Sequence, residues 1–433
     1  MQKGHGEGMR LNYKRTILAG LAFLSISAFW QLYDNNIPLM LKNTFGMGEK
    51  LSGVIMAMDN VLALFLLPYI GLLSDKVKTP IGKRMPFILL GTLGAVIFMT
   101  LIPIADMQGN LVLFLVALGL VLISMSLYRS PAVALMPDIT PKPLRSMANA
   151  IINLMGAIGG VYTLLMVKIF VSDEMTSYMP LFLSVAILMV VSVTILFLTI
   201  KENKLSLSNN PEYGDEVREE DSQQGETGAK MPKDVRKSYY FILASIFLWF
   251  TAYNAVTTAF SRYVQEVWGL AKGGYANSLM IATIAAILSY IPVGKFASKV
   301  GRKKTIIAGI ILMTLSYLAG FLMVEYSPMI YLVFALTGIG WASINVNSYP
   351  MIVEMSKSTD IGKYTGVYYT FSMTAQIVTP ILSGIFLEIS YRTLFPYAFI
   401  FSIASLCTML LVKHGDSKPM PKASAIENFD VDN

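Results

Sequence analysis

The chain has 433 residues, of which 55% are hydrophobic and only 14% are charged, and its mean hydropathy is +0.58. A single water-soluble globule cannot bury that much apolar surface, so the composition excludes an ordinary soluble domain. The net charge of +7 does not indicate a nucleic-acid partner, because the basic residues lie in the short connections between apolar blocks.

Cysteine and histidine are scarce. The one cysteine, Cys407, excludes a disulfide framework and a cysteine-based metal cluster. The two histidines, His5 and His414, lie outside the apolar blocks, so no histidine is available within a membrane for a metal site or a proton relay. No nucleotide-binding loop or paired catalytic constellation stands out. We therefore expect no enzyme, no metal and no cofactor.

Apolar blocks of about 20 to 27 residues recur along the chain, and this is the length that an α-helix needs to cross a bilayer. The sequence predicts an all-α membrane protein embedded in a lipid bilayer. Twelve spans are expected, at residues 16–41, 50–73, 86–105, 110–136, 144–171, 178–200, 238–265, 274–297, 304–324, 328–353, 361–386 and 393–413.

The basic residues predict the orientation. Of the 34 Lys and Arg residues, 27 lie on the side of the termini and six on the other side, and Arg129 is inside a span. This bias predicts cytoplasmic termini in a plasma membrane, such as a bacterial inner membrane. The basic pair Lys14-Arg15 leads into a span that is too long for a signal peptide, so we expect the first helix to be retained.

A densely charged segment divides the chain. Residues 201–237 are rich in charge, Gly, Ser and Gln, which is typical of a solvated linker. The predicted units are a six-helix bundle at 1–200, the cytoplasmic linker at 201–237, a second six-helix bundle at 238–415 and a tail at 416–433. We expect a monomer.

A repeat relates the two halves. The sequence from Gly71 to Asp75-Lys76, followed by Gly82-Lys83-Arg84, matches Gly294 to Ser298-Lys299 and Gly301-Arg302-Lys303 once residues 77–80 are removed. This pattern resembles the signature loop of the major facilitator superfamily, which implies two pseudo-symmetric bundles and alternating access.

Further motifs resemble the glycoside-pentoside-hexuronide:cation symporters, especially the sucrose symporters and their bacterial and animal relatives. These motifs are the 77–80 insertion followed by Lys83-Arg84-Met-Pro-Phe87, the segment Tyr128-Arg129-Ser-Pro131 to Asp138 with Arg145 and 148–150, and Gly362 to Gly366. Ala63, Leu67 and Arg129 stand where the melibiose-type sodium symporters carry aspartates. The resemblance therefore favours H+ over Na+ as the coupling ion.

Ionisable side chains inside a span are costly and are usually functional. Counted along their helices, Asp34 and Asp59 reach the same depth, where two carboxylates could share a proton. We expect both to carry the coupling proton, although Asp59 could instead only bind Asn60. Arg129 is counted to a level nearer the cytoplasm, where it could bind substrate, close a gate or extend to the surface. The gating residues are expected to be Asp75, Lys83, Arg84, Arg129 and Asp138.

Aromatic and amide side chains form a polar stripe on span one. Trp30 and Gln31 lie one turn before Asp34, and a ring face beside an amide suits a sugar. The second half supplies uncharged partners, and the substrate residues are expected to be Trp30, Gln31, Asn254, Asn345 and Gln376. Each of these side chains could instead only pack between helices.

The sequence therefore predicts proton-coupled symport of a glycoside or oligosaccharide. One alternative is an efflux antiporter for amphipathic drugs, which the 27 methionines keep open. Another is a membrane sensor or scaffold that does not transport.

Overall fold

The computed structural model describes residues 11–140, 145–205, 232–355 and 361–416, and these residues form helices and their connections. The N-terminal half contains α1 (Tyr13–Asn43), α2 (Glu49–Lys76), α3 (Met85–Met107), α4 (Leu111–Ile139), α5 (Arg145–Phe170), α6 (Met179–Thr199) and the short α7 (Glu202–Leu205). The C-terminal half contains α9 (Lys233–Trp268), α10 (Ala276–Val300), α11 (Arg302–Leu322), α12 (Ile330–Met355), α13 (Ile361–Ile389), the 3-10 turn η4 (Tyr391–Thr393) and α14 (Leu394–Leu410).

Twelve helices of the described part are long and apolar enough to cross a membrane, which confirms the predicted number of spans. Asparagines are the N-cap residues of two of these helices, α1 and α4. The Asn12 side chain accepts a hydrogen bond from Arg15 N at 3.0 Å, and the Asn110 side chain accepts one from Leu113 N at 3.0 Å. Two helices extend into the range predicted as a linker, since α7 occupies residues 202–205 and α9 starts at Lys233.

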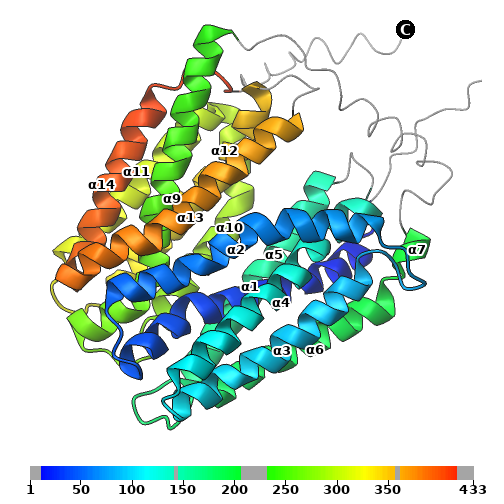
Figure 1. The fold of residues 1–433 in the computed structure, drawn as a ribbon. Coiled ribbons are helices and arrows are strands. Elements are labelled where there is room, and N and C mark those ends of the chain that lie inside the picture. Colours follow the sequence, from blue (N-terminus) through cyan, green and yellow to red (C-terminus); the bar gives the residue numbers. More distant parts are fainter. Residues whose placement is uncertain (1–10, 141–144, 206–231, 356–360, 417–433) are drawn as a thin grey trace, which may run out of the picture.

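The helices form two bundles, α1 to α6 and α9 to α14 (Figure 1). The bundles meet through three helix pairs, α2 with α13, α5 with α10 and α1 with α9. From this contact their axes diverge toward the end that carries α7 and the start of α9 (Figure 1). We call that end the linker end, and the other the far end.

Glycines, which have no side chain, allow backbones to approach one another closely at the far end. A Cβ on Gly53 of α2 would lie 2.1 Å from the Pro380 carbonyl oxygen of α13, and one on Gly273 would lie 2.5 Å from the Val171 carbonyl oxygen. Only glycine fits such contacts. The structure is therefore closed at the far end.

Candidate functional site

Four predicted residues come together around α1. The Arg129 guanidinium of α4 lies over the Trp30 ring of α1, with 5.6 Å between the guanidinium carbon and the ring centroid. Arg129 also interacts electrostatically with Asp34 on α1 and with Asp59 on α2. The two carboxylates interact with each other as well. This part of the N-terminal bundle thus combines one cation, two acids and an aromatic face.

The depth estimate for Arg129 was wrong. Helix counting placed this residue well below Asp34 and Trp30, whereas the structure places its guanidinium against the Trp30 ring. Helix α4 ends at Ile139, three residues beyond the predicted end at 136, but α1 also begins three residues before the predicted start at 16. Counting along the two helices therefore gives the same difference in depth as before, and helix length alone does not explain the contact. The long arginine stem supplies additional reach.

Asp59 also makes the local contact that the sequence had suggested. Its Oδ1 accepts a hydrogen bond from Asn60 Nδ2 at 2.7 Å. This bond leaves the second carboxylate oxygen available for other partners. The local contact and the electrostatic interaction with Arg129 therefore coexist.

Sequence reasoning missed Tyr33. Its ring is 1% exposed and packs edge-on against Trp30, with 5.4 Å between centroids. Its hydroxyl is buried without a hydrogen-bond partner in the described part, and it interacts electrostatically with Asp34 and Asp59. A tyrosine beside Asp34 in sequence was visible, but its inward orientation was not.

The C-terminal bundle faces this group with a pair of stacked rings. Tyr253 of α9 and Trp341 of α12 are 3.8 Å apart with an interplanar angle of 3°, and Phe250 packs edge-on against Trp341 at 5.3 Å. Tyr253 also interacts electrostatically with Asp34 of the N-terminal bundle. Neither ring is among the substrate residues predicted from the sequence.

The predicted amides differ in their surroundings. Asn254 Nδ2 is buried and lacks a hydrogen-bond partner among the described residues, and Asn345 is partly exposed one turn after Trp341. Gln376 donates to the Ser372 carbonyl of its own helix at 3.3 Å. The Gln31 side chain points toward Gly160 of α5, where a Cβ would lie 3.5 Å from its Oε1. Asn254 and Asn345 therefore fit a ligand site best.

Four of the five predicted gating residues, Asp75, Lys83, Arg84 and Asp138, form one ionic cluster at the linker end, whereas Arg129 lies at Trp30. Arg84 Nε donates to Asp138 at 2.9 Å, and a second guanidinium nitrogen binds Asp75. Lys83 Nζ is 3.2 Å from Asp138 and 3.9 Å from Asp75. The cluster lies within the N-terminal bundle.

Glu202, which the sequence analysis did not single out, supports this cluster. Its carboxylate accepts hydrogen bonds from the backbone N–H groups of Lys83, Arg84 and Met85 at 2.9 to 3.1 Å. Asp416 repeats the arrangement in the second bundle, where it accepts from Arg302 N at 2.6 Å and Lys303 N at 3.2 Å. Each acid follows the last span of its bundle and caps the helix after the signature loop.

A polar seam joins the bundles at the far end. Arg262 Nε of α9 donates to Glu49 Oε2 of α2 at 2.8 Å, and Tyr391 donates to Glu49 Oε1 at 2.6 Å. Lys42 of α1 pairs with Glu266 of α9 at 2.5 Å. These residues lie far apart in the sequence, so no motif indicated the seam.

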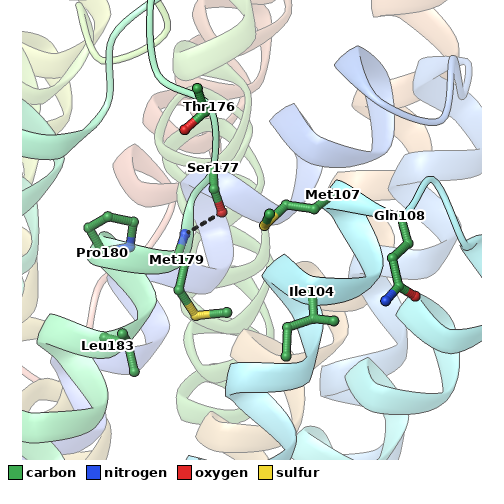
Figure 2. Close-up of a pocket in the computed structure, with 8 residues that line it drawn as sticks. All are labelled: Ile104, Met107, Gln108, Thr176, Ser177, Met179, Pro180 and Leu183. Atoms are coloured by element: carbon green, nitrogen blue, oxygen red, sulfur yellow. Dashed lines mark hydrogen bonds between the residues drawn. The ribbon is translucent and has the colours of Figure 1, made fainter.

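A cavity of about 600 Å³ lies elsewhere, between the end of α3 and the start of α6 (Figure 2). Its walls are mostly apolar, and the lining residues are Ile104, Met107, Gln108, Thr176, Ser177, Met179, Pro180 and Leu183. No ionisable side chain is among them. This cavity is therefore separate from the charged centre, the name we give to Arg129, Asp34 and Asp59 around Trp30.

Comparisons with known proteins agree with this architecture. A stretch of the chain is 27% identical over 165 residues to the sucrose transport protein SUC3 of Arabidopsis thaliana, and it covers 34% of this chain and 27% of that protein. The fold is similar to a POT family transporter solved with 5-aminolevulinic acid, with a TM-score of 0.72, 11% identity and coverage of 95% and 97% of the two chains. It is also similar to the inward-open xylose transporter XylE of E. coli, with a TM-score of 0.67, 14% identity and coverage of 94% and 97%.

The family model described as MFS/sugar transport protein matches residues 18–390. This range includes every residue of the charged centre and of the stacked rings. The chain therefore belongs to the MFS/sugar transport protein family and is a multi-pass membrane transporter.

Proposed function

We propose that the protein couples the entry of a glycoside or oligosaccharide to the entry of a proton by alternating access. The observation that carries this proposal is the arrangement around Trp30, where Arg129, Asp34 and Asp59 face the Tyr253–Trp341 stack of the other bundle.

The charges favour a proton as the coupling ion. Two carboxylates and one guanidinium leave a net charge of −1, which a single bound proton neutralises. In each transport cycle the site is closed off from water on both sides. A neutral site costs less free energy to enclose in this low-dielectric surrounding than a charged one. Arg129 already supplies a fixed cation next to both acids, so a sodium ion there would meet electrostatic repulsion.

The uncharged groups favour a sugar. Rings on both bundles offer apolar faces to the C–H groups of a pyranose. Trp30 Nε1 and Asn254 Nδ2 are buried donors without partners among the described residues, and sugar hydroxyls would satisfy them. The similarity to a sucrose transport protein supports the same substrate class.

The positive-inside bias supports a plasma-membrane location with the linker end in the cytoplasm. With that orientation, the closed far end corresponds to an inward-facing state. One chain supplies both faces of the site, so we expect a monomer to be sufficient.

Uptake into proteoliposomes tests the proposal. Radiolabelled sucrose and other glucosides are offered under an imposed pH gradient, an imposed sodium gradient or neither. We expect accumulation with the pH gradient alone. Accumulation that depends on sodium would contradict the coupling ion, and gradient-driven extrusion of amphipathic cations without sugar uptake would establish the antiporter alternative.

A further inference from the structure

A second cavity lies at the linker end of the N-terminal bundle, beside α7 (Figure 1). It has a volume of about 230 Å³ and lies between the connection that follows α2 and the end of α6. We call it the α7 cavity. Its lining combines apolar and cationic side chains, among them Pro80, Ile81, Phe197, Ile200, Lys201 and Lys204.

Residues 77–80, which have no counterpart in the second half of the repeat, form one wall of the α7 cavity. Asn203 Nδ2 of α7 donates to the carbonyl oxygens of Thr79 and Pro80, both at 2.9 Å. Thr79 Oγ1 in turn donates to the Gly82 carbonyl. Hydrogen bonds to successive backbone carbonyls hold this wall against α7, so the cavity is a built feature of the N-terminal bundle.

The lining of the α7 cavity carries a net positive charge. Lys201 and Lys204 are exposed, and neither forms an ion pair with another described residue. Glu202 is the one acid in the lining, and its carboxylate already accepts hydrogen bonds from three backbone N–H groups. Two lysines beside one engaged carboxylate favour an anionic ligand.

The α7 cavity also lies at the edge of the membrane. Helix α6 ends at Thr199, so the cavity is found where span six leaves the hydrocarbon region. Leu198 on the last turn of that span is 60% exposed. Lys201 Nζ is 5.7 Å from the centroid of the Phe197 ring, which brings a cation and an apolar face together at this level. A ligand with both an anionic group and an apolar part fits such a site.

From this arrangement we infer that the α7 cavity binds the headgroup of an anionic phospholipid. Its phosphate lies between Lys201 and Lys204, and its glycerol and upper acyl chain lie against Phe197 and Ile81. A free phosphate has no apolar part, so the lining favours the lipid. The bound lipid joins the end of α6 to the inserted residues 77–80. Neither the lipid nor its site depends on which substrate the protein transports.

Native mass spectrometry of the purified full-length protein in a neutral detergent tests the site. The protein is titrated with phosphatidylglycerol, phosphatidylcholine or inorganic phosphate. We expect phosphatidylglycerol to bind at one saturable site, and phosphatidylcholine, which has no net charge, to bind about tenfold more weakly. Lys201→Gln and Lys204→Gln together should weaken phosphatidylglycerol binding about tenfold to thirtyfold, because two cationic contacts are lost. Asn203→Ala removes no charge but releases the wall, and it should weaken binding about threefold to tenfold.

Lys299→Gln together with Lys304→Gln is the matched control, because both lysines are exposed at the linker end of the other bundle and the loss of charge is the same. This double variant should bind phosphatidylglycerol as the wild type does, and thermal unfolding checks that every variant is folded. An equal loss in the two double variants, or no loss in Asn203→Ala, would show a general attraction to the basic surface and would overturn the site. Equal binding of the two lipids, or the absence of any saturable site, would also overturn it. Inorganic phosphate that binds as tightly as phosphatidylglycerol would overturn the lipid as the occupant.

Discussion

Glu49 and Arg262 form an ion pair between the two bundles in which both side chains are almost fully buried, with exposed fractions of 4% and 7%. Removing one partner of such a pair leaves an uncompensated buried charge, which typically costs about 3 to 5 kcal/mol. The pair can exist only while the far end is closed. It therefore stabilises this conformation relative to one that is open at the far end.

The first prediction follows from this pair. Glu49→Gln should shift the equilibrium toward opening at the far end, measured as a longer distance between spin labels at Gln108 and Ala271 in a background without Cys407. Glu266→Gln is the control, since it breaks the more exposed Lys42 pair and should have a much smaller effect. Equal distance distributions for all three proteins would show that the buried pair does not hold the far end closed.

A second prediction concerns proton coupling. Asp34→Asn should abolish sugar accumulation driven by a pH gradient while sugar exchange across the membrane continues, because an amide keeps the shape but cannot carry the proton. Asp59→Asn should have the same effect if the two acids share the proton. Parallel measurement of accumulation and exchange in proteoliposomes separates coupling from binding. If the Asp34→Asn variant still concentrates sugar, the proton is carried elsewhere.

The third prediction tests the aromatic face at Trp30. Trp30→Ala should weaken sugar binding by about 1 to 3 kcal/mol, and Trp30→Phe should weaken it less, because phenylalanine retains a ring. Affinity is measured per folded molecule, which separates binding from protein abundance. If Trp30 only packs against Phe29 and Tyr33, the alanine variant will be less abundant but will bind with unchanged affinity.

The fourth prediction addresses the ionic cluster at the linker end. Asp75→Asn should slow turnover without greatly changing external affinity, because Arg84 would lose one of its two carboxylates. Glu325→Gln, in an exposed connection at the far end, serves as a control with the same loss of charge. Initial uptake rates over a range of sugar concentrations provide both parameters. Unchanged turnover would identify Asp75 as a solvated residue without a role in gating.

The last prediction compares the two helix caps. Glu202→Ala should lower stability by about 1 to 2 kcal/mol, because three backbone N–H groups lose their acceptor in a buried position. Asp416→Ala should cost less, since that carboxylate is exposed. Thermal unfolding in detergent measures both changes. A larger effect at Asp416 would contradict the dependence on burial.

The sequence alone determined the features that depend on composition and local pattern. Long apolar blocks predicted the twelve spans, since a helix of about 20 apolar residues is what a bilayer accepts. The repeated signature loop indicated two related halves. It also placed Asp75, Lys83 and Arg84 close together, because these residues flank one short connection.

Tertiary structure decided which distant residues meet. Arg129 reaches Trp30, Glu49 pairs with Arg262, and Tyr253 stacks on Trp341 because helices start at different depths and cross at angles that hydropathy does not specify. Counting 1.5 Å per residue estimates depth along one axis, but it contains no information on helix rotation or on the neighbouring helix. Those quantities depend on close packing, such as that of Gly53 against Pro380, and they are set by the whole bundle.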